Sequence, residues 1–356
     1  MEKKENPFIL AFGEVPEIML DEEKRSKIII NDIKASRPNF RNFMISGLRG
    51  SGKTVLLRSI QDQLSKDKEY VFVNLDMGDG KTKNLLAQFA AILVSLPGMK
   101  NLYNKAEVKF SLGNAELSLD NNIPFMDVRT EIEKMLKVLK TLGKKVIIMI
   151  DEVVDNDGFT VFASAYKELT NDYPVYLVMA GLKENTDNVI NNPVNTFLRR
   201  AYPIELEGLN ITLIRDEYEK ILEVPYDEAD KLAALTNRYS FAFQALGYAY
   251  FEYGADGFME EYDKLLELFV YRPLWSKLSH KDKRVLIGIN KAIKAGDGKA
   301  RTMDVLDSCG LKKNEYTPYK KRLCDATIIN STEIGIIRYN YPRFDVFVES
   351  NIPEMG

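Results

Sequence analysis

The sequence GLRGSGKT, residues 47–54, decides the fold class of this chain. Two glycines, Gly47 and Gly52, bracket four residues and are followed by Lys-Thr, which is the pattern of a phosphate-binding P-loop. Glycine allows the backbone to turn tightly enough for successive N–H groups to face one anion. Lys53 adds a positive charge for the β- and γ-phosphates, and the hydroxyl of Thr54 is a ligand for Mg²⁺.

The residues on either side of the loop fit the same motif. Residues 43–46 form a short apolar run that predicts a buried strand, and Leu57, Ile60 and Leu64 recur at helical spacing after the loop. Strand, loop and helix is the arrangement in which the helix dipole also favours a phosphate. The expected nucleotide-binding residues are therefore Gly47, Leu48, Arg49, Gly50, Ser51, Gly52, Lys53, Thr54 and Val55.

A second motif, VIIMIDE at residues 146–152, indicates which chemistry follows binding. The apolar run predicts a central parallel strand, whose carboxyl end would present Asp151 beside the P-loop. Asp151 and Thr54 are the expected Mg²⁺ ligands. Glu152 is placed to polarise an attacking water, which favours hydrolysis of a nucleoside triphosphate over transfer of its phosphoryl group to a small substrate. The alternative for Glu152 is a solvated acid at a strand end.

Two other nucleotide-dependent classes fit less well. The guanine-reading motif Asn-Lys-x-Asp of GTPases is absent, because the nearest string, at residues 104–107, ends in Glu107. A P-loop kinase of a small molecule remains the less favoured alternative, since it would leave Glu152 without a role.

Composition limits the class of protein. The chain of 356 residues is long for one core, and 45% hydrophobic with 28% charged residues is typical of a globular protein. Because the N-terminal residues have no apolar signal-like run and no stretch is long enough to span a membrane, we expect a cytoplasmic protein without a membrane partner. The two cysteines predict thiols rather than a disulfide framework, and the single histidine, His280, makes a zinc site improbable.

Charge is distributed unevenly along the chain. Residues 270–356 contain 16 Lys and Arg against 10 Asp and Glu, a net charge of +6, whereas the whole chain carries −3. The first 269 residues therefore carry −9. An acidic body with a basic C-terminal part hints at an anionic partner for that part.

The pattern of apolar residues divides the chain into three parts. Residues 1–208 alternate strands and helices, which predicts an α/β P-loop NTPase core with a parallel sheet. The strands are expected at residues 43–46, 70–75, 146–151, 175–180 and 202–206. Between them, residues 107–120 alternate around Gly113-Asn114 and predict an inserted β-hairpin.

The remaining two parts are mainly helical. Residues 209–268 predict a helical lid, and residues 269–356 predict three helices followed by two short strands, the outline of a winged helix. Its third helix and wing offer a set of side chains for the phosphates of double-stranded DNA. The candidate DNA-binding residues are Tyr319, Lys320, Lys321, Arg322 and Arg338. The competing interpretation is a winged helix that binds a protein.

P-loop, Asp-Glu strand, lid and winged helix together resemble the archaeal-type AAA-like ATPases, relatives of the STAND signalling NTPases and of the origin-recognition ATPases. The resemblance implies an AAA/ASCE-type core, ATP or ADP as ligand, and movement of the lid and winged helix with nucleotide state. It also implies an arginine acting on the γ-phosphate, for which Arg199 and Arg200 are the candidates; basic residues at a helix end with surface partners are the alternative.

The resemblance has two further consequences. It suggests that the leader residues Phe8, Phe12 and Pro16 contact the adenine, and that Arg238 of the lid reaches the phosphates, the alternative in each case being an exposed side chain. The sequence therefore predicts a slow ATPase that acts as a switch. Its partners beyond ATP or ADP are expected to be double-stranded DNA, another protein or further copies of the chain.

Overall fold

The computed structural model describes residues 5–11, 13–20, 22–78, 84–99, 125–295, 300–331, 333 and 335–352. The chain divides into two compact units. Unit 2 consists of Glu22–Gly47 and Lys53–Leu206, and unit 1 consists of Met1–Asp21, Leu48–Gly52 and Glu207–Gly356. The loop at residues 47–54 is thus shared between the two.

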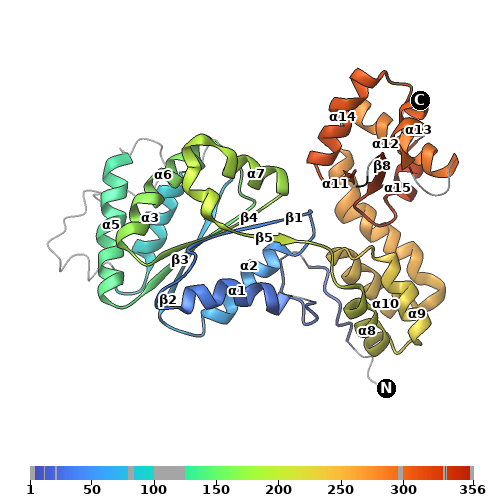
Figure 1. The fold of residues 1–356 in the computed structure, drawn as a ribbon. Helices are drawn as coiled ribbons and strands as arrows, with labels where there is room; N and C mark the ends of the chain where they lie inside the picture. The colour runs from blue at the N-terminus through green and yellow to red at the C-terminus, as the bar shows by residue number, and fades with distance from the viewer. Residues whose placement is uncertain are drawn as a thin grey trace. The chain divides into compact units, whose positions relative to one another are not determined.

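Unit 2 is built on a parallel sheet of five strands in the order β2-β3-β4-β1-β5 (Figure 1). All five expected strands are present, each within a residue of the expected bounds at either end. They are β1 (Asn42–Gly47), β2 (Tyr70–Asp76), β3 (Lys145–Asp151), β4 (Val175–Gly181) and β5 (Tyr202–Leu206). Strand β4 lies between β1 and β3, so the loop after β1 and the acids after β3 follow strands that are not neighbours.

Alternation of side chains along the strands gives the sheet two apolar faces. Phe43 and Ile45 of β1 pack in one cluster with helices α1 (Glu22–Lys34) and α2 (Lys53–Leu64). Met44 faces the opposite side, with α3 (Leu85–Ser95), α5 (Phe125–Thr141) and α6 (Asp157–Asp172). Since side chains of a strand point alternately to the two faces, this near-continuous apolar pattern requires helices on both sides.

Two short helices complete unit 2, α7 (Lys183–Asn191) and the 3₁₀ helix η1 (Pro193–Arg200). Asn84 caps α3 by accepting the N–H groups of Leu86 and Ala87. The expected hairpin at residues 107–120 lies outside the described residues.

The lid residues of unit 1 form α8 (Ile211–Leu222), α9 (Tyr226–Leu235) and α10 (Ser240–Leu266). Gly254 interrupts α10 with φ of 67°, a left-handed value that glycine tolerates. A π-helical turn, η2 (Glu267–Tyr271), and α11 (Arg272–Trp275) follow.

The C-terminal part contains α12 (His280–Ala295), α13 (Thr302–Cys309) and α14 (Lys313–Asp325), the three helices that the sequence predicts. Strands β7 (Ile329–Asn330) and β8 (Ile336–Tyr339) were also expected. A further strand, β6 (Ala300–Arg301), completes a small antiparallel sheet in the order β6-β8-β7. The last helix, α15 (Phe344–Ser350), has no counterpart in the sequence analysis.

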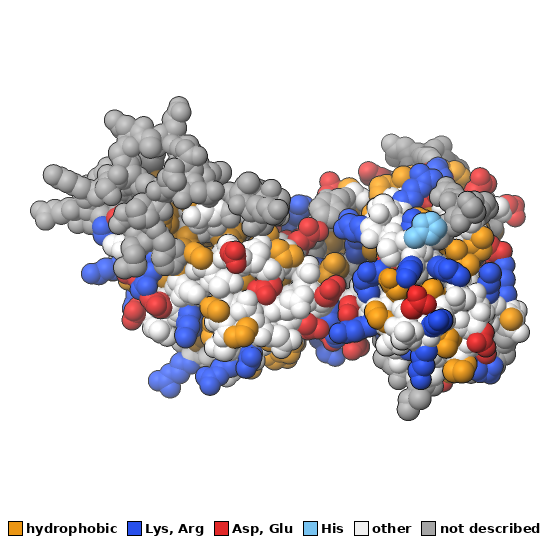
Figure 2. All heavy atoms as spheres, turned by 90° about the horizontal axis from the view of Figure 1, so that it is seen from above, with side chains coloured by type: hydrophobic (Ala, Val, Ile, Leu, Met, Phe, Trp, Pro, Cys, Tyr) orange, Lys and Arg blue, Asp and Glu red, His pale blue; other side chains and the backbone are white. Residues whose placement is uncertain are grey.

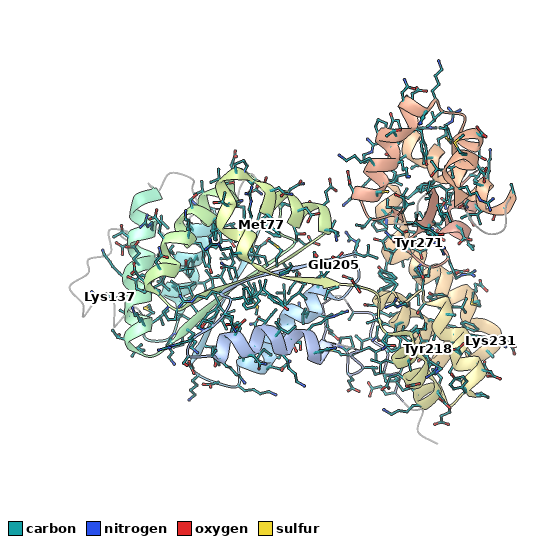
Figure 3. The ribbon with its side chains drawn as sticks, viewed as in Figure 1. Met77, Lys137, Glu205, Tyr218, Lys231 and Tyr271 are labelled. Carbon is teal, nitrogen blue, oxygen red and sulfur yellow. The ribbon has the colours of Figure 1, made fainter. Side chains whose placement is uncertain are left out.

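One apolar core runs through unit 1, from the leader through the lid to the C-terminal helix. Tyr218 and Tyr271, labelled in Figure 3, are both buried in it. Tyr271 of η2 packs against Phe344 and Phe347 of α15, with ring centroids 5.0 and 5.4 Å apart. Residues 209–268 and 269–352 therefore share their core.

Candidate nucleotide site at residues 47–54

Two glycines shape the turn between β1 and α2. Gly50 and Gly52 have φ values of 73° and 94°, in the left-handed region that disfavours residues with a Cβ. The N–H of Ser51 donates to the carbonyl of Leu48 at 3.2 Å and closes the turn. A backbone that passes through left-handed residues in this way forms the concave array of N–H groups known to bind anions.

Lys53 is the first residue of α2 and is only 9% exposed. Its Nζ donates to the carbonyl oxygen of Gly47 at 3.2 Å. Lys53 directly follows the loop, so its ammonium lies beside the residues that the sequence analysis assigns to phosphate binding.

Thr54 and Asp151 meet although 97 residues separate them. The hydroxyl of Thr54 donates to Oδ2 of Asp151 at 2.6 Å. Two hard oxygen ligands held this close suit Mg²⁺, which accepts one or two protein oxygens and completes its shell with water and phosphate. The expected pair of metal ligands is thus brought together.

Glu152 directly follows β3 with a φ of 53°, which is uncommon for a residue other than glycine. Its N–H donates to Oδ1 of Asp151 at 2.9 Å, and the next residue, Val153, donates to the carbonyl of Ala180 at 2.8 Å. The left-handed turn leaves the Glu152 side chain exposed at the end of the sheet. Non-glycine residues in this region cluster at functional sites.

The sequence analysis did not single out Asp76, which ends β2 directly opposite Asp151 in the strand register. Its Oδ1 accepts the N–H of Gly78 at 2.8 Å. The sequence pattern that could have identified Asp76 was present, since the largely apolar stretch of β2 ends in an acid, as that of β3 does. Asp76 therefore adds a third carboxylate, beside those of Asp151 and Glu152, to the carboxyl edge of the sheet.

Three further contacts of the loop lie within unit 1 and were not foreseen. Tyr239 donates its hydroxyl to the Arg49 carbonyl at 2.6 Å. The N–H of Phe241 donates to the Gly50 carbonyl at 3.2 Å, and the hydroxyl of Ser240 donates to the Ser51 carbonyl at 3.2 Å. We call Tyr239, Ser240 and Phe241 the loop clamp.

The lid and leader residues that the sequence analysis assigns to nucleotide contacts interact with other parts of unit 1. Arg238 donates from Nε to the carbonyl of Leu209 at 2.7 Å and from its terminal nitrogen to that of Gly208 at 3.1 Å. Phe8 is 3% exposed in the core of unit 1, with its ring 5.7 Å from that of Phe243. Phe12 lies outside the described residues, and Pro16 is half-buried.

Arg199 and Arg200, the candidate arginine fingers, end η1 immediately before β5. Both side chains are exposed, and neither pairs with an acid in the part of the chain that the structure describes. They are therefore accessible to a second molecule.

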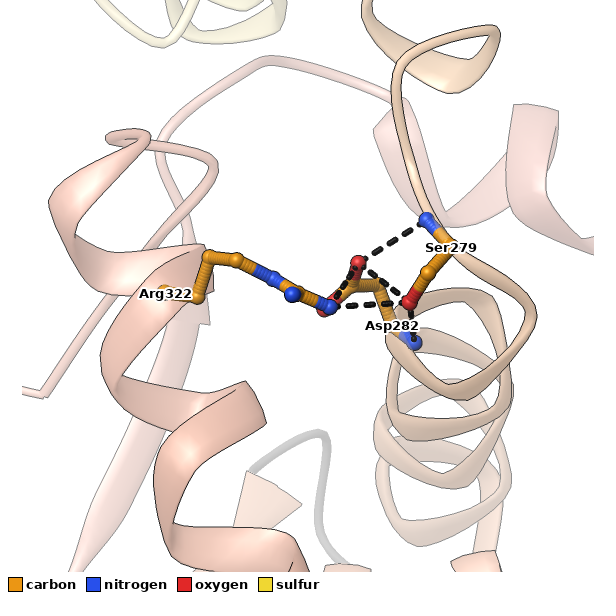
Figure 4. Close-up of polar contacts among 3 residues, drawn as sticks. All are labelled: Ser279, Asp282 and Arg322. Atoms are coloured by element: carbon orange, nitrogen blue, oxygen red, sulfur yellow. Dashed lines mark hydrogen bonds and ion pairs between the residues drawn. The ribbon is translucent and has the colours of Figure 1, made fainter.

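Within the C-terminal part, Arg322 of α14 belongs to an internal network (Figure 4). It forms an ion pair with both carboxylate oxygens of Asp282 of α12, the Nε contact measuring 2.9 Å, and donates to the hydroxyl of Ser279 at 2.8 Å. Asp282 is only 2% exposed. Arg322 thus neutralises a buried carboxylate.

The other candidate DNA-binding residues differ in whether they already contact side chains of unit 1. The centroid of the Tyr319 ring is 5.0 Å from the guanidinium of Arg322 and 5.7 Å from Nζ of Lys281. Arg338 pairs with Glu333 at 2.9 Å. Lys320 and Lys321 form no ion pair among the described residues. In Figure 2, Lys and Arg side chains are spread over the visible face of unit 1 with acids among them.

Neither a metal cluster nor a membrane segment adds to this site. Within the described ranges, no group of three or more His, Cys, Asp or Glu side chains is close enough to hold a metal ion. None of the described helices combines the length and the apolar character needed to cross a bilayer. Both cysteines of unit 1 are free thiols, Cys309 buried and Cys324 partly so.

Comparison with known proteins supports the fold. A family model described as a domain of unknown function (DUF8462) matches residues 269–348. The comparison with curated proteins gives no match. The solved Orc1 protein of Aeropyrum pernix in complex with DNA is 15% identical, with 95% of this chain and 94% of that chain covered at a TM-score of 0.50.

Two other solved structures are matched at lower TM-scores. Cdc6p from Pyrobaculum aerophilum is 14% identical over 97% of each chain, with a TM-score of 0.45. A STAND protein with a tetratricopeptide repeat sensor from Pyrococcus horikoshii is 16% identical over 95% of this chain and 44% of that chain, with a TM-score of 0.41. The Orc1 likeness and the sheet of unit 2 show that the chain has the fold of an AAA-like P-loop ATPase.

Proposed function

We propose that the protein binds ATP with Mg²⁺ at residues 47–54 and hydrolyses it slowly, as a nucleotide-dependent switch. The observation that carries this proposal is the hydrogen bond of 2.6 Å between Thr54 and Asp151, beside a loop with two left-handed glycines. The loop amides bind the phosphates, and Lys53 exchanges the Gly47 carbonyl for phosphate oxygens. Thr54 and Asp151 would hold Mg²⁺, which would supply positive charge against the phosphates.

In this proposal, Glu152 is the residue that directs hydrolysis. Its exposed carboxylate, turned out at the end of β3 by the left-handed backbone, accepts a hydrogen bond from the attacking water and orients it. Arg199 or Arg200 stabilises the charge that develops on the γ-phosphate, acting from a neighbouring copy of the chain. A P-loop kinase lacks a comparable use for Glu152.

For the output of the switch, we propose that α12 to α14 and the small sheet form a winged helix that contacts double-stranded DNA. Lys320 and Lys321 of α14 are the residues that supply the charge, because Arg322 and Arg338 are paired with acids of the same unit. The alternative output is a protein partner. The Orc1 protein of Aeropyrum pernix was solved in complex with DNA, which favours the first.

The test of nucleotide binding compares two lysine variants by calorimetry with ATP and Mg²⁺. Lys53→Ala is expected to weaken ATP binding at least a hundredfold, because it removes the charge that meets the phosphates. Lys145→Ala is the matched control, since its Nζ also donates to a carbonyl, that of Ile33, at 2.9 Å. Normal affinity of Lys53→Ala, or equal loss in both variants, would contradict the site.

A further inference from the structure

The lid helix α10 begins without a capping side chain of its own. Tyr239 occupies the N-cap position but makes no side-chain cap, so the first N–H groups of the helix need acceptors from elsewhere. The Gly50 carbonyl supplies one of them, accepting from Phe241 at 3.2 Å. The P-loop therefore caps the helix, and the loop and α10 depend on each other for hydrogen bonds.

The clamp fixes three consecutive peptide groups of the loop. The carbonyl of Arg49 accepts a hydrogen bond from the Tyr239 hydroxyl, and that of Gly50 accepts one from the Phe241 N–H. The carbonyl of Ser51 accepts one from the Ser240 hydroxyl. In a planar trans peptide, the C=O of one residue is antiparallel to the N–H of the next. With these carbonyls turned toward α10, the N–H groups of Gly50, Ser51 and Gly52 point away from it.

Tyr239 is the strongest member of the clamp. Its hydrogen bond is the shortest of the three, and burial raises the pKa of its phenol well above the usual value, so the hydroxyl keeps the proton that it donates. Its oxygen also lies where a side chain on Gly50 would be, 2.2 Å from the ideal Cβ position. Only glycine at position 50 permits both the left-handed backbone and this contact.

We infer that Tyr239, with Ser240 and the Phe241 amide, is a positioning element for phosphate binding: it holds the amides of Gly50 and Gly52 in the orientation that receives the phosphates. This inference rests on the proposed function of the loop. A loop already held in its binding conformation binds more tightly, because less of the binding free energy is spent on ordering it. A phosphate on the N–H side polarises the same peptide groups and strengthens their carbonyls as acceptors.

By thermodynamic linkage, the coupling works in both directions. If the clamp raises phosphate affinity, phosphate binding must stabilise the clamp by the same factor. The lid helix then senses the occupancy of the loop through the hydrogen bonds that the clamp donates to the loop carbonyls.

The experiment measures binding of ATP, ADP and inorganic triphosphate to the full chain by calorimetry. Triphosphate has no base or ribose, so it reports on the loop alone. Tyr239→Phe removes the hydroxyl and keeps the ring, and we expect about three- to tenfold weaker binding of all three ligands. Tyr262→Phe is the matched control, because this buried tyrosine of the same helix donates to the carbonyl of Leu235 at 3.1 Å, away from the loop.

A second variant and a second readout protect the test against a folding defect. Ser240→Ala removes the partly buried hydroxyl that donates to Ser51, and is expected to weaken triphosphate binding about two- to threefold. In the wild type, triphosphate should slow hydrogen exchange of the Phe241 amide, the donor to Gly50.

The outcomes separate this inference from the proposed function. Unchanged affinity in both Tyr239→Phe and Ser240→Ala, or an equal loss in Tyr262→Phe, overturns the inference while nucleotide binding stands. Wild-type protein that binds neither ATP nor triphosphate overturns the proposed function, and the inference with it. Selective loss in the clamp variants, together with protection of Phe241, supports both.

Discussion

The hydroxyl of Thr54 lies 2.6 Å from Oδ2 of Asp151, which joins the first turn of α2 to the end of β3. Helix α2 follows β1, and β1 is not a neighbour of β3 in the sheet, because β4 lies between them. The contact therefore depends on the order of the strands in the sheet as well as on the two motifs. It also gives the two residues a shared role that can be tested.

Thr54→Val keeps the shape of the side chain and removes the hydroxyl. We expect the affinity for ATP in the presence of Mg²⁺ to fall at least tenfold, because a ligand of the metal is lost, while affinity without Mg²⁺ changes little. Calorimetry with and without Mg²⁺ measures both. An equal loss in the two conditions would show that Thr54 acts on the phosphates or on the loop rather than through the metal.

Glu152→Gln separates hydrolysis from binding. The amide keeps the size of the side chain but cannot act as a base, so we expect ATP turnover to fall about a hundredfold or more with the dissociation constant unchanged. Steady-state phosphate release and calorimetry give the two numbers. Glu205→Gln is the control, since this exposed acid, labelled in Figure 3, lies in the edge strand β5 of the same sheet and pairs with Lys183. Unaltered turnover in Glu152→Gln would exclude it from catalysis.

The sequence predicts the core of unit 2 well because local signals suffice there. Each strand is an apolar run with a clear end, and Asp151 and Glu152 follow directly from such an end. Helix α1 was missed because its apolar residues are confined to one short run, residues 28–30, and Ile33, so the helical period does not repeat over several turns. Strand β6 and helix α15 are too short for periodicity to identify.

Pairings between distant residues could not be read from the sequence. The loop clamp depends on backbone carbonyls, which carry no sequence signal, and on the path that brings Tyr239 to Arg49. Arg322 has the residue type of a phosphate contact, but only the packing of α14 on α12 shows that Asp282 already neutralises it. Residue type indicates a charge, whereas the fold decides what the charge meets.

The DNA-binding proposal makes a prediction about salt dependence. Lys320→Ala with Lys321→Ala should weaken binding of double-stranded DNA and reduce the slope of log affinity against log salt by about 1.8, if each lysine contacts one phosphate. Fluorescence anisotropy at several salt concentrations, with ATP, with ADP and without nucleotide, measures the slope. Lys220→Ala with Lys231→Ala changes two exposed lysines of the lid as a control.

Arg322→Ala should behave differently from the lysine variants. It leaves the buried carboxylate of Asp282 without its partner, and we expect the free energy of unfolding to fall by about 1–3 kcal/mol, a range reduced because Arg322 itself is half exposed. Urea unfolding measures this loss. A DNA salt slope that changes with Arg322→Ala but not with the lysine pair would reverse the assignment of the two roles.

Alkaline pH tests the buried tyrosine beside the clamp. Burial raises the pKa of Tyr341 to about 12, although the Thr327 side chain and the Arg49 backbone lower it, and its ring lies 5.3 Å from that of Tyr239. The folded pKa exceeds the unfolded value of about 10, so the folded state favours the neutral phenol. Its contribution to stability is complete below pH 10 and is lost as the pH rises toward 12.

For this single group, the loss amounts to about 1.4 kcal/mol at pH 11. Tyr341→Phe cannot ionise, so its free energy of unfolding, measured in urea, should fall less steeply between pH 9 and pH 11 than that of the wild type. Other buried tyrosines, including Tyr239 and Tyr271, contribute to both curves and cancel in the difference. A constant difference between the two proteins across this range would mean that Tyr341 titrates as it does in water, and that its hydroxyl is not buried beside Arg49.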